Sequence, residues 1–220
     1  MAYLSSDPKW LKFLERKLPW LGIPKLAIIL ITLQGFGFFL VNTDPIWAGR
    51  LALLPENVLH GGEWWRLVTF LAMPLSLSPI WMIFTAWFLY SILDWIESEW
   101  GAFKTTFYVL ISVVLTVLFS LFFSYPVVSV SEFTSTLFLA AAALFPEQEI
   151  RLYMILPVKM KYMAWLALAF FVIHLFKGEW IDRFFLITLY SNYLIFFGPE
   201  ILRQIRDWKR RRDYRARFNN

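Results

Sequence analysis

The chain has 220 residues, of which 59% are apolar, 20% aromatic and only 17% charged. A soluble domain is typically about 45–50% apolar and about 25% charged, so this composition excludes an ordinary soluble domain and indicates an integral membrane protein. The absence of cysteine excludes disulfides, thiolate metal sites and cysteine nucleophiles. The two histidines, His60 and His174, lie far apart in the sequence, which argues against a histidine-based metal centre. We therefore expect neither a metal ion nor another cofactor.

Apolar segments of the length needed to cross a bilayer, about 20 residues each, recur along the chain. They predict an all-α integral membrane protein with six transmembrane helices. The six predicted spans cover residues 26–41, 78–96, 105–123, 128–145, 160–176 and 180–197.

The distribution of basic residues predicts the orientation of these spans in the membrane. If both termini are cytoplasmic, 17 of the 21 Lys and Arg residues lie on the cytoplasmic side, as the positive-inside rule requires. The other side then holds Arg50, Arg66, Lys177 and Arg183. A compact chain without a recognisable targeting segment suits a bacterial inner membrane.

Two segments outside the spans have patterns of their own. Residues 7–18 begin with Asp7 and Pro8, a favourable helix start. They place Trp and Leu residues opposite Lys12 and Arg16, which predicts an amphipathic helix in the membrane interface. Residues 42–69 are rich in Trp and Leu and predict a structured, membrane-embedded element. The predicted domains are an interfacial helix at 1–22, a six-helix membrane domain at 23–200 and a basic cytoplasmic tail at 201–220.

Polar side chains inside predicted spans are candidates for function, because such groups are costly in a bilayer. They are Asp94, Glu132, Thr134 and Asn192. Glu132 also follows Ser129 with the spacing of a capping box, so we favour a structural role for it at the start of a helix. Asp94 lies near the cytoplasmic end of its span, where we expect it to be solvated.

Ser131, Ser135 and His174 are weak candidates for catalysis. The two serines and the histidine are predicted near the outer ends of neighbouring spans, so a Ser–His dyad is geometrically conceivable. A lone histidine near an interface is more often a packing residue, and this is the reading we favour.

The C-terminal segment interleaves arginine with aromatic residues, a pattern that also occurs in RNA-binding arms. Because it directly follows a predicted span on the cytoplasmic side, contact with anionic lipid is the simpler interpretation, and we expect no nucleic-acid partner. The residues predicted to contact lipid are Arg203, Arg206, Lys209, Arg210, Arg211 and Arg212.

Three stretches resemble the rhomboid superfamily of six-helix membrane proteins. Residues 62–69 contain a Trp-Arg element similar to the one that leads from the first outer loop into the second helix. Residues 94–101 resemble the end of that helix, and residues 138–165 resemble the fourth helix, its following loop and a Pro-Val-Lys entry to the fifth. The matching positions are Trp64, Trp65, Arg66, Glu97, Gly101, Pro157 and Lys159.

The departures from the rhomboid pattern concern catalysis. Ser131 lies near the position of the family's catalytic serine, but the flanking glycines are missing. The family carries its catalytic histidine on the sixth helix, and residues 190–198 contain no histidine. Trp81 and Thr85 occupy the approximate positions of the histidine and asparagine that assist the oxyanion. The resemblance thus implies a rhomboid-like protein that has lost peptidase chemistry.

Inactive members of the superfamily bind membrane clients during trafficking, quality control or degradation. The resemblance therefore implies a non-catalytic protein that binds other transmembrane proteins. One alternative is a stable accessory subunit of a larger membrane complex, suggested by the 12 Trp residues. The other is an active intramembrane serine protease with a relocated dyad of Ser131 or Ser135 with His174.

Overall fold

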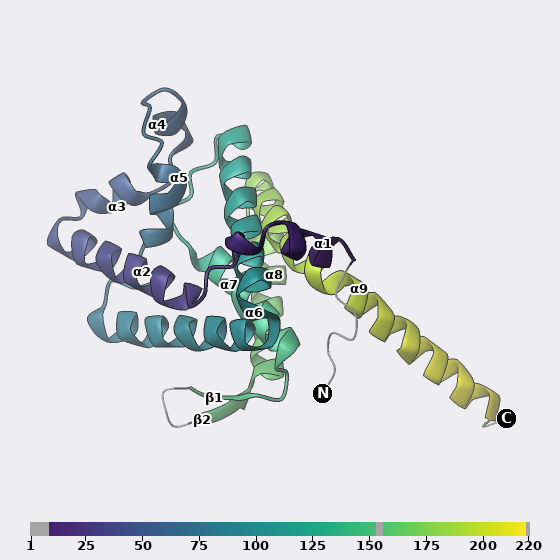
Figure 1. The fold of residues 1–220 in the computed structure, drawn as a ribbon. Helices are drawn as coiled ribbons and strands as arrows, with labels where there is room; N and C mark the ends of the chain where they lie inside the picture. The colour runs from purple at the N-terminus through teal and green to yellow at the C-terminus, as the bar shows by residue number, and fades with distance from the viewer. Residues whose placement is uncertain (1–8, 153–155, 219–220) are drawn as a thin grey trace.

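The protein is mostly helical in a computed structural model, which describes residues 9–152 and 156–218 (Figure 1). Within these residues three helices are long and apolar enough to cross a membrane: α2 (Leu26–Thr43), α6 (Pro79–Phe123) and α8 (Met160–Lys177). A shorter apolar helix, α7, covers Ser131–Leu144. The long C-terminal helix α9 covers Trp180–Phe218.

The predicted second and third spans are two helices that meet at Gly101, and the label α6 covers both. Gly101 interrupts α6 with φ 80° and ψ 164°, a backbone conformation that side-chain-bearing residues rarely adopt. The connection between the two helices is therefore shorter than the gap between the predicted spans 78–96 and 105–123, and Lys104 lies in the second of the two helices. The chain changes direction at Gly101, and Figure 1 shows the resulting bend of α6.

A short helix precedes the first apolar helix. Helix α1 covers Lys9–Lys17, followed by a 3₁₀ turn at Pro19–Leu21. Leu11 is buried, and the ring of Trp10 packs against Phe107 and Phe196. The expected capping residues Asp7 and Pro8 lie outside the described residues, and the interfacial location of this helix stays a prediction.

Residues 42–69 are folded, in agreement with the expectation of a structured element. They contain α3 (Ile46–Leu51), α4 (Pro55–Leu59) and α5 (Arg66–Thr69), and the 3₁₀ helix η2 (Phe70–Ala72) follows. Backbone hydrogen bonds in both directions join Leu53 to Val127, on the segment that precedes α7. This pairing fixes residues 42–69 to the helical bundle.

The structure contains an antiparallel hairpin that an all-α prediction omits. Strand β1 (Glu149–Leu152) pairs with β2 (Leu156–Lys159), with Ile150 opposite Val158. Pro157 and Lys159 therefore lie on a strand. Each strand has four residues, too few for the alternating pattern that distinguishes a strand from a loop.

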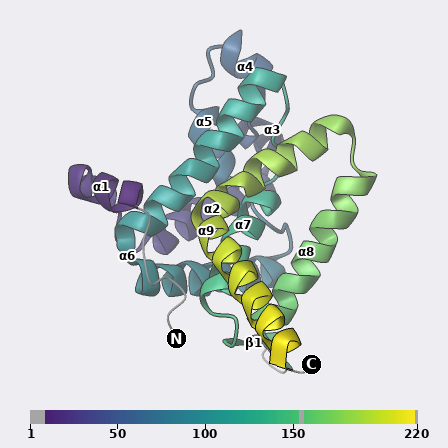
Figure 2. The same ribbon diagram turned by 90° about the vertical axis from the view of Figure 1, so that its right-hand side faces the viewer.

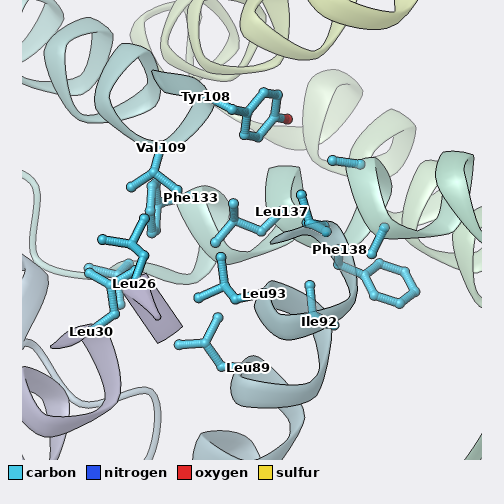
Figure 3. Packing of buried hydrophobic residues seen from close by; sticks show 14 of the residues in the cluster. Leu26, Leu30, Leu89, Ile92, Leu93, Tyr108, Val109, Phe133, Leu137 and Phe138 are labelled. Atoms are coloured by element: carbon cyan, nitrogen blue, oxygen red, sulfur yellow. The ribbon is translucent and has the colours of Figure 1, made fainter. Parts of the chain in front are cut away.

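The core lies where α2, both halves of α6 and α7 meet. Leu26 and Leu30 of α2 face Leu89 and Leu93 of α6, and Leu137 of α7 lies among them (Figure 3). Helix α7 forms the centre of the bundle, since nine of its 14 residues are buried.

Helix α8 packs far less tightly than α7. Only 6% of its apolar segment is buried, compared with 33% for α2 and 39% for α6. It lies at the edge of the bundle beside α9 (Figure 2). Helix α9 continues without a break beyond residue 200, with Pro199 inside it, and its C-terminal part leads away from the bundle (Figure 1).

Candidate functional site

The residues considered for catalysis line one cavity of about 340 Å³ between α7, α8 and α9. Ser131, Glu132 and Ser135 come from the first turns of α7, and His174 comes from the last turn of α8. Tyr190 of α9 closes the third side. The structure thus brings the two serines and the histidine to the same cavity, although they are far apart in sequence.

The serine hydroxyls are engaged in contacts within α7. Ser131 Oγ donates to the Glu132 carboxylate at 2.9 Å and lies 2.8 Å from Ser129 Oγ. Ser135 Oγ donates to the backbone carbonyl of Ser131 at 2.8 Å. Among the described residues no hydrogen bond joins His174 to either serine. The hydrogen-bonded Ser–His pair that a relocated dyad requires is therefore not among the described contacts.

The predicted capping box at the start of α7 is wrong. The N-cap residue is Val130, and no side chain caps the helix. Ser129 Oγ instead accepts from the Ser131 backbone N–H at 3.1 Å. Because the helix begins one residue later than the spacing implied, Glu132 lies at its second position and its carboxylate reaches Ser131.

Asn192 is the predicted polar residue that the structure buries completely. Its amide nitrogen donates to the Tyr108 carbonyl at 3.0 Å and to Ser112 Oγ at 2.6 Å. These bonds join α9 to the second half of α6. Asn192 therefore holds two helices together inside the apolar core.

The other predicted polar residues have local roles. Thr134 donates to the carbonyl of Val130 at 2.9 Å, one turn back along α7. Asp94 is exposed on α6. Thr85, at a position that the resemblance connects with the oxyanion, donates to the carbonyls of Trp81 and Met82. No group of three or more His, Asp or Glu in the described residues could hold a metal ion.

The Trp-Arg element is organised around Arg66. This side chain is 4% exposed and donates to the carbonyls of Gly49, Arg50 and Ala52 at 2.6–2.9 Å. It also pairs with the carboxylate of Glu63, and this bond lowers the pKa of Glu63. Arg66 thus satisfies the free carbonyls at the end of α3, a role that the motif alone does not reveal.

Trp64 and Trp65 are exposed, and Gly101 forms the bend of α6. The Glu97 carboxylate accepts from the Lys25 backbone N–H at 2.8 Å. This bond fixes the start of α2 beside the bend.

The Pro-Val-Lys stretch belongs to a small ionic cluster at the hairpin. Glu147 pairs with Lys161 at 2.6 Å and with Lys159 at 2.9 Å. Hydrogen bonds from Lys161 and Lys159 lower the pKa of Glu147 to about 2, and the bond to Glu147 raises the pKa of Lys159. The cluster ties the end of α7 to the start of α8.

Asp182 and Arg183 are neighbours in sequence but bind different partners. Asp182 accepts from the Tyr125 hydroxyl at 2.9 Å and from the Glu179 N–H at 3.2 Å. Arg183 donates to the carbonyls of Gly178 and Phe176. Both residues fasten the turn between α8 and α9, and Asp182 also joins it to the end of α6.

The basic residues predicted to contact lipid lie on the C-terminal part of α9. Arg203, Arg206 and Arg210 are exposed. The side chains of Lys209, Arg211 and Arg212 lie outside the part that the structure describes.

Comparison with known proteins gives one family. The family model described as a rhomboid domain matches residues 61–184, more than half of the chain. No curated protein and no solved structure matches. Together with the apolar helices, this match identifies the chain as an integral membrane protein.

Proposed function

The chain belongs to the rhomboid family, and we propose that it is a non-catalytic member that binds other transmembrane proteins. In this role it acts as a scaffold, a trafficking factor or a quality-control factor. It cuts none of the proteins that it binds.

The observation that carries this proposal is the hydrogen bond that the Ser131 hydroxyl makes. The hydroxyl donates to Glu132, its neighbour in sequence, and Ser135 donates to a backbone carbonyl. His174 lines the same cavity without a hydrogen bond to either hydroxyl among the described contacts. A hydrogen-bonded series of serine, histidine and a group that orients the histidine is not among the described contacts, which supports the proposal.

The sixth-helix region supports the same proposal. Residues 190–198 contain no histidine, and Asn192 on this segment is buried against Tyr108 and Ser112. A carboxamide is not a base, and this one holds two helices together.

One feature of the helices favours binding to a transmembrane partner. Helix α8 leaves most of its apolar surface uncovered. This surface is available to a neighbouring transmembrane helix.

The experiment that tests the loss of catalysis is labelling with a fluorophosphonate probe in membranes, beside an active rhomboid as positive control. We expect the wild-type chain to give no more label than a double variant with Ser131→Ala and Ser135→Ala. Label that is lost in His174→Ala would overturn the proposal and support the relocated dyad.

A stable accessory subunit is the second candidate function, and exposed tryptophans favour it. Trp20 and Trp180 are each at least 70% exposed, so both are available to a partner protein. Purification in mild detergent with quantitative mass spectrometry separates the two. A partner at fixed stoichiometry indicates a subunit, whereas several substoichiometric membrane proteins indicate client binding.

We place both termini in the cytoplasm of a bacterium, with the exposed arginines of α9 at the anionic inner leaflet. Because the chain contains no cysteine, single-cysteine variants report topology directly. We expect a membrane-impermeant maleimide to label Leu59→Cys in intact cells and Arg206→Cys only after lysis. The reverse pattern would contradict this orientation.

A further inference from the structure

A second hollow follows the polar cavity along the same three helices. It measures about 530 Å³ and is lined almost entirely by apolar and aromatic side chains, among them Leu139 and Leu168. Phe171 and Tyr190 line both hollows, so the two are adjacent. We call them the polar chamber and the apolar chamber.

The two chambers are stacked along the helix axes. Glu132 and Leu139 are seven residues apart on α7, which corresponds to about 10 Å. His174 and Leu168 are six residues apart on α8, about 9 Å. The site is therefore a groove with a polar end and an apolar end, separated by less than the thickness of one leaflet, about 15 Å.

The groove has the dimensions of a lipid and is too small for a helix. An α-helix with side chains is about 10–12 Å wide, so three turns of it occupy more than twice the volume of the apolar chamber. An acyl chain is a narrow apolar rod, and the loosely packed α8 leaves room for one beside α7 and α9.

The polar chamber selects the headgroup by its charge. The Glu132 carboxylate lines it, and no lysine or arginine does so. Its described hydrogen-bond donor is the Ser131 hydroxyl, which leaves acceptor capacity on the carboxylate. His174 and Tyr190 place an imidazole and a phenol on the other walls, and both can donate to a phosphate oxygen.

We propose that the two chambers form one lipid site that takes a phospholipid with a primary ammonium in its headgroup. The ammonium lies at Glu132, the phosphate lies between His174 and Tyr190, and one acyl chain fills the apolar chamber. The lipid supports α8 from the inside. This site is independent of the proposed client binding, because it accounts for the inner side of α8 and not for its outward face.

The test is native mass spectrometry of the full chain, purified and exchanged into phosphatidylethanolamine, phosphatidylcholine or phosphatidylglycerol with identical acyl chains. Phosphatidylcholine keeps the positive charge but has no N–H donor. We expect retention of phosphatidylethanolamine to exceed that of the other two about tenfold, the value of one charge-assisted hydrogen bond. Equal retention of the three lipids, or a preference for phosphatidylglycerol, would overturn the proposal.

Two pairs of variants locate the bound lipid. Glu132→Gln should abolish the preference for the ethanolamine headgroup, whereas Asp94→Asn, at an exposed carboxylate on α6, should keep it. Leu168→Trp fills the apolar chamber and should reduce retention of all three lipids, and Leu166→Trp, one helix face away, should not. A preference that survives both Glu132→Gln and Leu168→Trp would show that the lipid binds elsewhere.

Discussion

Buried polar side chains join separate elements of this protein. Arg66 connects the end of α3 to α5, and Asn192 connects α9 to α6. Water cannot replace their hydrogen bonds in an apolar interior, so a lost partner leaves an unpaired group at substantial cost. These two residues should therefore be far more sensitive to substitution than their exposed neighbours.

Arg66→Met should destabilise the protein by about 3 kcal/mol, because it leaves three carbonyls without their donor and removes the cationic partner of the Glu63 carboxylate. Thermal unfolding in detergent, followed by circular dichroism, measures the loss. Arg50→Met is the matched control, since Arg50 is exposed and stacks on Trp47. If both substitutions lowered the unfolding temperature by the same amount, the buried hydrogen bonds of Arg66 would not be the cause.

Asn192 and Ser112 should couple in a double-mutant cycle. We expect Asn192→Leu and Ser112→Ala to interact by about 1 kcal/mol, the upper range for hydrogen bonds between membrane helices. The cycle is measured by reversible unfolding in mixed micelles. Strictly additive effects of the two substitutions would contradict the 2.6 Å hydrogen bond between these side chains.

The Glu147 cluster should make stability depend on acid. Its bonds to Lys161 and Lys159 lower the pKa of Glu147 from 4.5 to about 2. A lowered folded-state pKa contributes stability that is complete above about pH 4.5 and is lost as the pH falls towards 2. Wild type should therefore be more stable than Glu147→Gln at pH 6, and the two should converge near pH 2. Glu149→Gln, in the same hairpin, should retain the wild-type profile.

Two glycines of α2 test how closely the elements pack. A Cβ on Gly37 would lie 1.8 Å from the carbonyl oxygen of Ala72 in η2, whereas a Cβ on Gly35 meets nothing within 4 Å. Gly37→Ala should destabilise the protein by about 2 kcal/mol through overpacking. Gly35→Ala should be neutral or stabilise it by about 0.5 kcal/mol. Unfolding midpoints of the two variants check the difference, and equal midpoints would contradict the close approach of α2 to η2.

The sequence predicts the helices that consist of a long apolar segment. The predicted spans at 26–41 and 160–176 agree with α2 and α8 to within two residues at each end. The sequence also predicts the break between the spans at 78–96 and 105–123, and residues 94–101 resemble a helix end; the pattern does not show that Gly101 makes the turn without a longer loop. The hairpin at 149–159 was not predicted, because its two strands have only four residues each and pair only in the folded chain.

Sequence reasoning also located part of the site. The order of the spans predicted that Ser131, Ser135 and His174 lie near one another, and they line one cavity. The hydrogen bond from Ser131 to Glu132 could not be predicted, because it depends on the helix beginning at Ser131 and not at Val130. The carbonyl partners of Arg66 likewise depend on where α3 ends.

At the scale of the whole molecule, a tightly packed centre adjoins a loosely packed edge. Helices α2, α6 and α7 bury the core, while α8 contacts the bundle on a narrow face (Figures 2 and 3). The ionic cluster at its start and the bonds of Asp182 and Arg183 beyond its end hold α8 in place. An apolar helix that is anchored at its ends and exposed along its length is suited to contact a neighbouring transmembrane segment.

The most direct test of the account places a photoreactive amino acid on the outward face of α8, at Leu166, and cross-links the protein in native membranes. The same residue at Leu118, an exposed position on α6, serves as control. We predict cross-links from Leu166, and not from Leu118, to intact transmembrane proteins identified by mass spectrometry. Cross-linked partners that are cleaved within their own membrane span would contradict a non-catalytic role if the same partners are intact when the protein carries Ser131→Ala.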